Sequence, residues 1–74
     1  MTVVKHLLVR EQLLGQIKTM RPDDLLPQER ELAETFQVSR TTVRQALQSL
    51  IEDGLIYSIR GQGTFVSKGR IPRA

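Results

Sequence analysis

The sequence predicts a mainly α-helical fold that ends in a small antiparallel β-hairpin. Two observations support this fold class. Hydrophobic residues recur at helical spacing in three segments before Gly54, and they alternate with polar residues after it. The chain has 74 residues, of which 39% are hydrophobic and 26% charged, a composition typical of one small globular domain.

The composition excludes several classes of site. The chain has no cysteine and one histidine, so neither a disulfide framework nor a thiolate or multi-histidine metal site is possible. No apolar run approaches the roughly 20 residues that cross a bilayer, and no signal peptide is visible. We therefore expect a cytoplasmic protein with no membrane partner, no metal and no cofactor.

The first predicted helix covers residues 5–20. Its hydrophobic residues form one stripe, which consists of Val9, Leu13, Ile17 and Met20 and is widened by Leu7 and Leu14. Gly15 inside this helix costs about 1 kcal/mol relative to alanine. The segment Arg21-Pro22-Asp23-Asp24 then interrupts the pattern, as proline and paired aspartates do in loops.

A short second helix is expected after Leu26-Pro27, because proline suits a helix entry, where its missing N–H has no partner to lose. Glu29 and Glu31 lie in or near the first turn, where the helix dipole favours negative charge. Leu26 is expected to pack across the start of the helix. The apolar side of the helix consists of Leu32, Ala33 and Phe36.

The third predicted helix covers residues 39–53 and has the clearest pattern. Ser39 is a favourable N-cap, since its hydroxyl can accept a free backbone N–H of the first turn. Gly54 is expected in the left-handed conformation just after the helix. The core-facing stripe consists of Val43, Ala46, Leu47, Leu50 and Ile51. Only Gln37 and Val38 separate Ser39 from the preceding helix, which predicts a tight turn.

After Gly54 the pattern is that of a β-hairpin. Two sets of residues alternate, Leu55, Tyr57 and Ile59 with Ile56, Ser58 and Arg60. Gly61-Gln62-Gly63 then turns the chain, and Thr64-Phe65-Val66 returns. We expect Phe36 and Phe65 in the core, with Tyr57 also facing inward. Residues 1–67 are thus expected to form the domain, and the basic residues 68–74 the start of a linker.

Positive charge is concentrated in the second half of the chain. Residues 1–37 carry a net charge of −1 and residues 38–74 a net charge of +4. A basic half predicts a polyanionic partner, although small domains are also often basic for solubility alone. The positions of the charges have to decide between these two interpretations.

Two helices joined by a short turn, the second of them basic, form a helix–turn–helix arrangement. The exposed side of the third helix has no acidic residue before Glu52 and consists of Arg40, Thr41, Thr42, Arg44, Gln45 and Gln48. Arginine can donate two hydrogen bonds to guanine and glutamine can pair with adenine, while threonine can contact phosphate or a thymine methyl. This pattern favours double-stranded DNA over a solvated face, which normally mixes both signs.

The predicted hairpin supplies a further cation at its tip. Arg60 lies beside Gly61-Gln62-Gly63, where two residues without a Cβ atom allow the backbone to approach another surface. The glycines by themselves are explained by the turn. With Arg60 next to them, they favour contact with a narrow minor groove, which attracts arginine.

Several ordered motifs resemble the DNA-binding domain of GntR-family bacterial transcription regulators, most closely the HutC branch. These motifs are Leu26-Pro27-Gln28-Glu29-Arg30-Glu31-Leu32-Ala33, Val38-Ser39-Arg40-Thr41-Thr42-Val43-Arg44-Gln45-Ala46-Leu47, Gly54-Leu55 and Arg60-Gly61-Gln62-Gly63-Thr64-Phe65-Val66. The resemblance covers about residues 7–67. It implies a winged helix–turn–helix that binds a pseudo-palindromic operator as a dimer, usually as a repressor released by a metabolite.

The resemblance implies DNA contacts in three places. It assigns them to Arg30 at the start of the second helix, to Arg40, Thr41, Thr42 and Arg44 on the third, and to Arg60 and Gly61 at the hairpin tip. From the same elements we add Ser39, Gln45, Gln62 and Gly63. Arg30 could instead pair with Glu31 or Glu34. Two residues depart from the family pattern, since Asp23 and Gln37 stand where glycine is common.

Family members also carry a C-terminal domain that dimerises and binds a small-molecule effector, and the 74 residues do not include one. We therefore expect a DNA-binding fragment. Two other functions were weighed. An enzyme would have to rely on His6, Asp23-Asp24 or Glu29-Glu31 in a thin core, so we expect none. A winged helix for protein or RNA contact would need exposed aromatic residues, and the chain has only Phe36, Tyr57 and Phe65.

Overall fold

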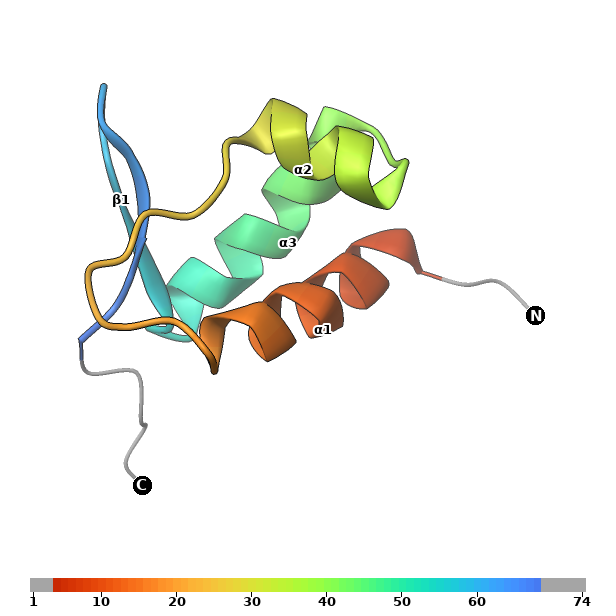
Figure 1. Cartoon of the computed structure of the whole chain (residues 1–74). Coiled ribbons are helices and arrows are strands. Elements are labelled where there is room, and N and C mark those ends of the chain that lie inside the picture. The colour runs from red at the N-terminus through yellow and green to blue at the C-terminus, as the bar shows by residue number, and fades with distance from the viewer. Residues whose placement is uncertain (1–3, 69–74) are drawn as a thin grey trace.

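A computed structural model describes residues 4–68, in which three helices precede a two-stranded antiparallel sheet. The elements are α1 (Lys5–Ile17), α2 (Glu29–Phe36), α3 (Arg40–Glu52), β1 (Ile56–Ile59) and β2 (Gly63–Val66). In Figure 1, α1 and α3 run side by side, α2 packs against the first part of α3, and the hairpin stands at the far end. The predicted fold class is confirmed, whereas linker residues 69–74 lie outside the described residues.

Helix α1 buries Val9, Leu13 and Ile17 of the predicted stripe but ends at Ile17, short of the predicted end at residue 20. Met20 follows the helix and is partly buried against the core. The carbonyl of Gln16 at this helix end accepts the hydroxyl of Thr19 at 2.8 Å and its backbone N–H at 3.0 Å. Leu7 is 49% exposed, so the prediction that it widens the stripe was wrong. The reason is geometric, because a residue two positions before Val9 is rotated by about 200° around the helix axis.

Helix α2 begins at Glu29, with Gln28 as its N-cap. The backbone N–H of Gln28 donates to Oε1 of Glu31 at 3.1 Å, as in a capping box. Pro27 directly precedes this cap, so the second helix follows Leu26-Pro27 as predicted. Glu29 and Glu31 occupy the first turn as expected, and Leu26 is buried in the same cluster as Leu32.

The turn between α2 and α3 has the predicted length and the predicted cap. Gln37 adopts a left-handed conformation with φ of 57°, and Val38 donates its backbone N–H to the carbonyl of Ala33 at 3.0 Å. Ser39 caps α3 by accepting the backbone N–H of Thr42 at 3.0 Å. Gly54 after α3 has φ of 76°, which confirms the predicted left-handed residue.

The hairpin is joined to the body by a segment that sequence reasoning did not predict to be extended. In the hairpin Ile56 pairs with Val66 and Ile59 with Gly63. The loop after α1 then runs along β2. The backbone N–H of Asp23 donates to the carbonyl of Val66 at 2.7 Å, and that of Leu26 donates to the carbonyl of Thr64 at 2.8 Å. We call residues 56–66 the wing. At its base, β2 is hydrogen-bonded to β1 on one side and to the loop after α1 on the other.

The two faces of the wing differ in burial. Ile56 and Val66 are buried, whereas Tyr57 and Phe65 are half-buried on the opposite face and stack with ring centroids 5.5 Å apart. The hydroxyl of Tyr57 donates to Oδ1 of Asp23 at 2.6 Å. The prediction that Phe65 and Tyr57 face inward was therefore wrong, because alternation along each strand gives the core positions to their neighbours.

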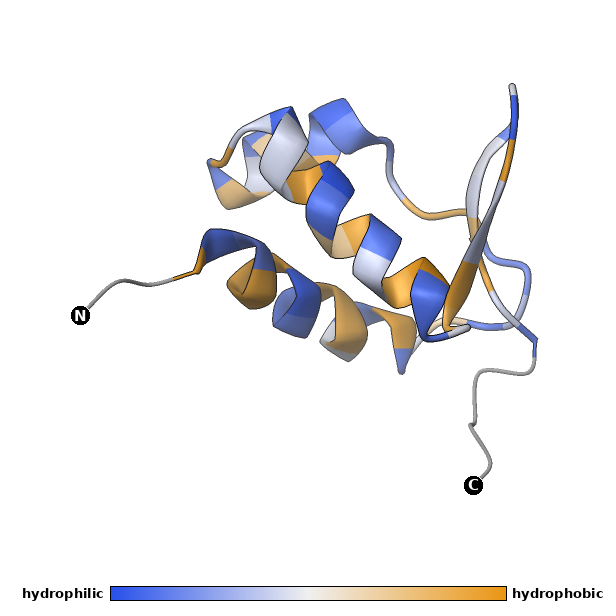
Figure 2. Cartoon of the chain, turned by 180° about the vertical axis from the view of Figure 1, so that it is seen from behind, coloured by the Kyte–Doolittle hydropathy of each residue, from blue (hydrophilic) through white to orange (hydrophobic). Residues whose placement is uncertain are grey.

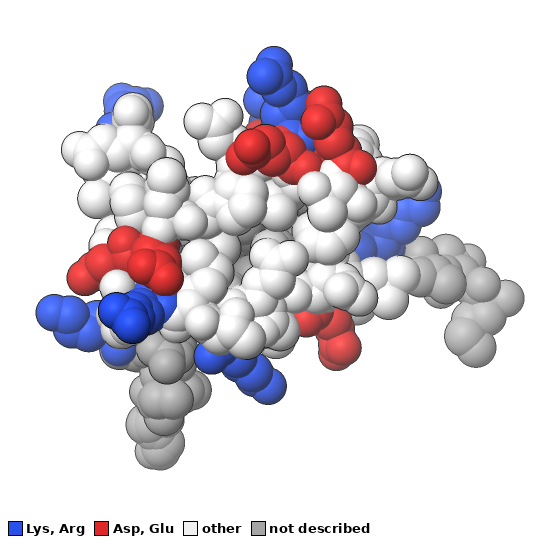
Figure 3. All heavy atoms as spheres, in the orientation of Figure 1, with Lys and Arg blue, Asp and Glu red and all other residues white. Residues whose placement is uncertain are grey.

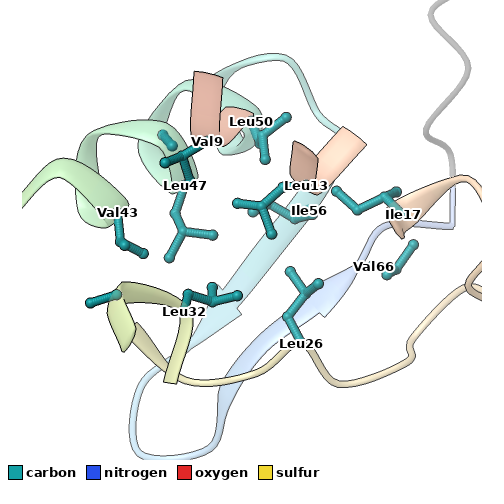
Figure 4. Packing of buried hydrophobic residues seen from close by; sticks show 12 residues of the cluster. Val9, Leu13, Ile17, Leu26, Leu32, Val43, Leu47, Leu50, Ile56 and Val66 are labelled. Atoms are coloured by element: carbon teal, nitrogen blue, oxygen red, sulfur yellow. The ribbon is translucent and has the colours of Figure 1, made fainter. Parts of the chain in front are cut away.

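The core joins α1, α2, α3 and the wing. It consists of Val9, Leu13, Ile17, Leu26, Leu32, Ala33, Val43, Ala46, Leu47, Leu50, Ile56 and Val66. Figure 4 shows side chains from all of these elements pointing toward one another, and Figure 2 shows hydrophobic and hydrophilic residues alternating along α1 and α3. Phe36 packs against this cluster from its edge. Because the wing contributes to the same core as α3, the two elements keep a fixed relation to each other.

Candidate nucleic-acid interface

The outward side of α3 presents most of the polar residues expected there. Arg40, Thr41, Arg44, Gln45 and Gln48 are exposed. Thr42 is only half-buried, because it belongs to the capped first turn. The apolar stripe of α3 is buried against α1, α2 and β1, so the opposite side is the one left for a partner.

Ser39 has a structural role in addition to the DNA contact expected of it. Its Oγ accepts the backbone N–H of Thr42 and lies 2.9 Å from the Oγ1 of the same residue. Both hydrogen bonds fix the first turn of α3. The free backbone N–H groups of that turn point out of the helix start, where an anion such as phosphate is favoured.

The tip of the wing places the other predicted residues at the surface. Arg60, Gly61 and Gln62 are exposed, and the backbone N–H of Gln62 donates to the carbonyl of Ile59 at 2.9 Å. Gly61 and Gly63 have φ of 81° and 130°, conformations that side chains rarely adopt. A Cβ atom at Gly63 would also lie 2.9 Å from Cδ1 of Leu25. This tip geometry requires glycine.

A groove of about 430 Å³ lies between α3, the start of α2 and the wing tip, and we call it the central groove. Arg40 lines it from α3, Glu29 from α2, and Arg60 from the wing together with Gly61, Gln62 and Gly63. Leu25, Leu26, Leu47 and Ile59 contribute apolar surface. The structure thus brings Arg40 and the wing tip together around one concavity. Arg30, Thr41, Arg44 and Gln45 are not among the residues that line it.

A carboxylate stands among the arginines of α3. Arg44 donates from Nε to Oε2 of Glu29 at 3.0 Å and from Nη2 to Oε1 at 3.1 Å, and Nη2 of Arg40 lies 3.7 Å from Oε1. The hydrogen bonds from Arg44 lower the pKa of Glu29 below its ordinary value, against an opposing effect of partial burial. Conversely, Glu29 raises the pKa of Arg44.

This cluster corrects the prediction of an acid-free cationic surface. The third helix itself has no acid before Glu52, but the fold adds Glu29 from the neighbouring helix, 15 residues away from Arg44 in sequence. Sequence reasoning assigned Glu29 to the first turn of α2, which is correct. It missed the role of Glu29 on this surface, because the side of α3 that α2 covers depends on the angle between the helices.

Arg30 and Arg60 differ from the paired arginines. Within residues 4–68 neither forms an ion pair, so the alternative pairing of Arg30 with Glu31 or Glu34 is not observed. In Figure 3, positive side chains at the wing tip stand apart from negative ones, whereas over α2 positive and negative side chains lie side by side.

Residues 4–68 contain no group of three or more His, Cys, Asp or Glu side chains that could bind a metal ion. No helix among them has the length and hydrophobicity needed to cross a membrane.

Comparison with protein families places residues 5–66 in the profile of the bacterial regulatory proteins, gntR family. The chain is 53% identical over 68 residues to the HTH-type transcriptional repressor NagR of Bacillus subtilis (strain 168), covering 89% of this chain and 28% of that protein. It is 46% identical over 69 residues to the arabinose metabolism transcriptional repressor of Geobacillus stearothermophilus, covering 90% of this chain and 19% of that protein. The chain therefore spans less than a third of either relative.

Solved structures give the same relationship for the fold. AraR(DBD) in complex with operator ORE1 superposes with a TM-score of 0.84 at 40% identity, covering 90% of this chain and 83% of that chain. PhnF from Mycobacterium smegmatis superposes with a TM-score of 0.74 at 47% identity, covering 80% of this chain and 26% of that one. The arrangement of three helices and a wing is shared with both proteins.

Proposed function

Because this chain belongs to the GntR family of bacterial regulatory proteins, we propose that it binds double-stranded DNA in a sequence-dependent way, as the DNA-binding domain of a transcription repressor. NagR and the arabinose regulator are named as transcriptional repressors, and AraR(DBD) was solved in complex with operator DNA. These relatives are regulators and not enzymes, in agreement with the function expected from the sequence.

In this proposal α3 enters the major groove. Its exposed arginine, threonine and glutamine side chains match the donors and acceptors of base edges and phosphates. Arg44 and Gln45 lie beyond the first turn and are the candidates for base contacts. Arg30, Ser39, Thr41 and Thr42 lie near the starts of α2 and α3, where contacts to the phosphates would set the register.

The wing contacts the neighbouring minor groove. Arg60 is exposed at the tip, and the glycines on either side of Gln62 let the backbone approach the DNA. A narrow minor groove has enhanced negative potential and attracts an inserted arginine. Arg60 is therefore expected to favour A·T-rich sequence next to the site read by α3.

One observation carries this proposal more than any other. Arg40 of α3 and Arg60 of the wing lie on the same concavity, and α3 and the wing are fixed to each other through a shared core. A strand of DNA backbone that separates a major from a minor groove would then meet positive charge from both sides. Two arginines on a rigid frame are more useful for a duplex than for a flexible single strand.

The rest of the regulatory mechanism belongs to the whole protein. We infer that residues 1–67 are the DNA-binding domain, and that residues 68–74 begin a linker to a domain that dimerises and binds a small-molecule effector. Two copies of the DNA-binding domain would then contact the halves of a pseudo-palindromic operator. The protein would act in the cytoplasm, at the nucleoid when bound.

Selection of duplexes from a random pool by this chain tests the proposal. We expect recovery of a short half-site, with an affinity that falls steeply between about 50 and 200 mM salt because phosphate contacts release counterions. Selection with a full-length protein should recover two half-sites related by a two-fold axis. A recovered pool that stays random, or an affinity that does not change with salt, would refute the proposed function.

A further inference from the structure

A negative charge in the middle of a surface proposed to bind a polyanion needs an explanation. The side chain of Glu29 is 27% exposed, so it is within reach of a bound duplex, and its charge repels phosphate. Capping does not require it, because the capping box of α2 uses Glu31. Any negative residue in the first turn would satisfy the helix dipole equally well. The contact that sets Glu29 apart is the one with Arg44.

The geometry of that contact decides what Arg44 can still do. Nε and Nη2 of Arg44 both donate to the Glu29 carboxylate, one to each oxygen. This leaves both hydrogens of Nη1 and the second hydrogen of Nη2 as donors at the outer end of the guanidinium. Two donors side by side match the O6 and N7 atoms of guanine. The pair therefore presents Arg44 in a single orientation that remains suitable for reading a base.

We propose that Glu29 is a positioning residue that increases sequence discrimination by holding Arg44 in a base-reading orientation and cancelling charge that would otherwise bind any phosphate. This inference rests on the proposed function. Prior orientation reduces the side-chain entropy lost on binding the correct site. A carboxylate near the interface penalises contacts that rely on phosphate alone, which are the contacts of non-specific binding.

The arrangement of charges around Glu29 supports this role. Arg40 lies 3.7 Å from the same carboxylate, so one negative charge faces two arginines of the recognition helix. Both arginine side chains remain more than 60% exposed, and Glu29 orients them without burying them. Glu34 lies on the same helix, but it forms no ion pair in the described part of the chain. It therefore provides a matched control of equal charge.

The test compares Glu29→Gln with Glu34→Gln on two duplexes of equal length, one recovered by selection and one of random sequence. We expect Glu29→Gln to bind the random duplex more tightly and with a steeper salt dependence, by about one released counterion. The ratio of selected to random affinity should fall by about three- to tenfold relative to Glu34→Gln. A third variant, Glu29→Asp, keeps the charge but shortens the reach, and should lower the ratio by less.

The outcomes separate this inference from the proposed function. If the unmodified chain shows no preference between the two duplexes, the proposed function itself fails. If the unmodified chain discriminates and Glu29→Gln discriminates as well as Glu34→Gln does, only the role of Glu29 is refuted. If Glu29→Gln gains affinity equally on both duplexes, Glu29 acts only as a surface charge and its role in discrimination is likewise refuted. Thermal melts of each variant establish that it is folded. If Glu29→Gln does not fold, the comparison of Glu29→Asp with Glu34→Gln still tests the role of Glu29.

Discussion

Helix α3 and the wing tip, the two parts of the proposed interface, differ in whether their arginines are paired with a carboxylate. On α3, Arg44 donates two hydrogen bonds to Glu29, and Arg40 lies near the same carboxylate. At the wing tip, Arg60 forms no ion pair with any residue in the range 4–68. An arginine held by a carboxylate has few orientations and suits the fixed geometry of a base edge. An arginine without such a partner can follow the backbone or the width of a groove.

A fourth arginine, Arg10, has a purely structural role. Arg10 of α1 pairs with Asp53 just after α3, and its Nη1 donates to Oγ of Ser49 at 2.7 Å. These contacts tie α1 to the end of α3, away from the central groove. A count of positive charges therefore overstates the surface available for DNA, since some of the arginines are paired with a carboxylate of the protein.

The largest expected effect is on the paired arginine. Arg44→Ala should weaken binding to the selected duplex by roughly 10- to 100-fold and relax the preference at one base pair, because it removes a bidentate contact and leaves Glu29 without its partner. Repeating the duplex selection with the variant measures both effects. If binding instead weakens equally on every sequence, Arg44 contacts phosphate and the contrast with Arg60 disappears.

The next effect concerns the backbone conformation of the wing at Gly63. Gly63→Ala should lower the free energy of unfolding by about 1–2 kcal/mol, since φ of 130° disfavours a side chain and the added methyl approaches Leu25. Urea denaturation measures the change, and binding should lose the contribution of the wing while the preference set by α3 persists. Gly15→Ala is the control, because no atom lies within 4 Å of its added methyl and alanine favours the helix. Equal stability of the two variants would contradict the strain assigned to Gly63.

The sequence predicted the elements of the fold well because each is encoded by neighbouring residues. The helical stripes apart from Leu7, the Ser39 cap and the left-handed Gly54 are local features, and they are confirmed, as is the GntR family. The substitutions at Asp23 and Gln37, where the family commonly has glycine, also proved compatible with the backbone. Both residues adopt positive φ, as glycine would. Aspartate tolerates this conformation better than most residues.

What the sequence could not predict depends on contacts between distant elements. The pairing of Asp23 and Leu26 with β2, and the pair between Glu29 and Arg44, arise from packing angles that no local pattern specifies. The inward position expected of Phe65 failed for a related reason, because either face of a short hairpin can be the buried one. The contacts of the candidate site residues with DNA remain predictions.

A smaller effect is expected for the free arginine. Arg60→Ala should weaken binding by about three- to tenfold and reduce the salt dependence by about one counterion, because a single flexible cation is lost. The loss should be greatest on duplexes whose wing-side sequence is an A-tract, where the minor groove is narrow. Titrations on matched A-tract and G·C-rich duplexes provide the measurement. An unchanged preference for A-tracts would remove Arg60 from the minor groove.

The smallest effect is a dependence of stability on acidic pH, which we expect from α3 and not from the wing tip. Arg44 lowers the pKa of Glu29 in the folded state below the ordinary 4.5. A carboxyl group with a lowered pKa stabilises the fold above its unfolded-state pKa and loses that contribution as the pH falls through its folded-state pKa. The pair thus stays ionised near neutral pH, where it distinguishes α3 from the wing.

Below pH 4.5 the contribution of the ion pair between Glu29 and Arg44 to stability should decrease, and the variant Glu29→Gln, which lacks this pair, isolates that contribution. Between about pH 5 and pH 3 we expect the stability of the unmodified chain to fall more steeply than that of Glu29→Gln. The additional fall should be less than about fivefold in the folding constant, as for other exposed pairs. Urea denaturation of both proteins at each pH gives the difference, in which carboxylates common to both, such as Asp53 beside Arg10, largely cancel. Parallel curves would mean that Glu29 gains no stability from its arginines, and would leave a role in DNA recognition as the remaining physical reason for its position.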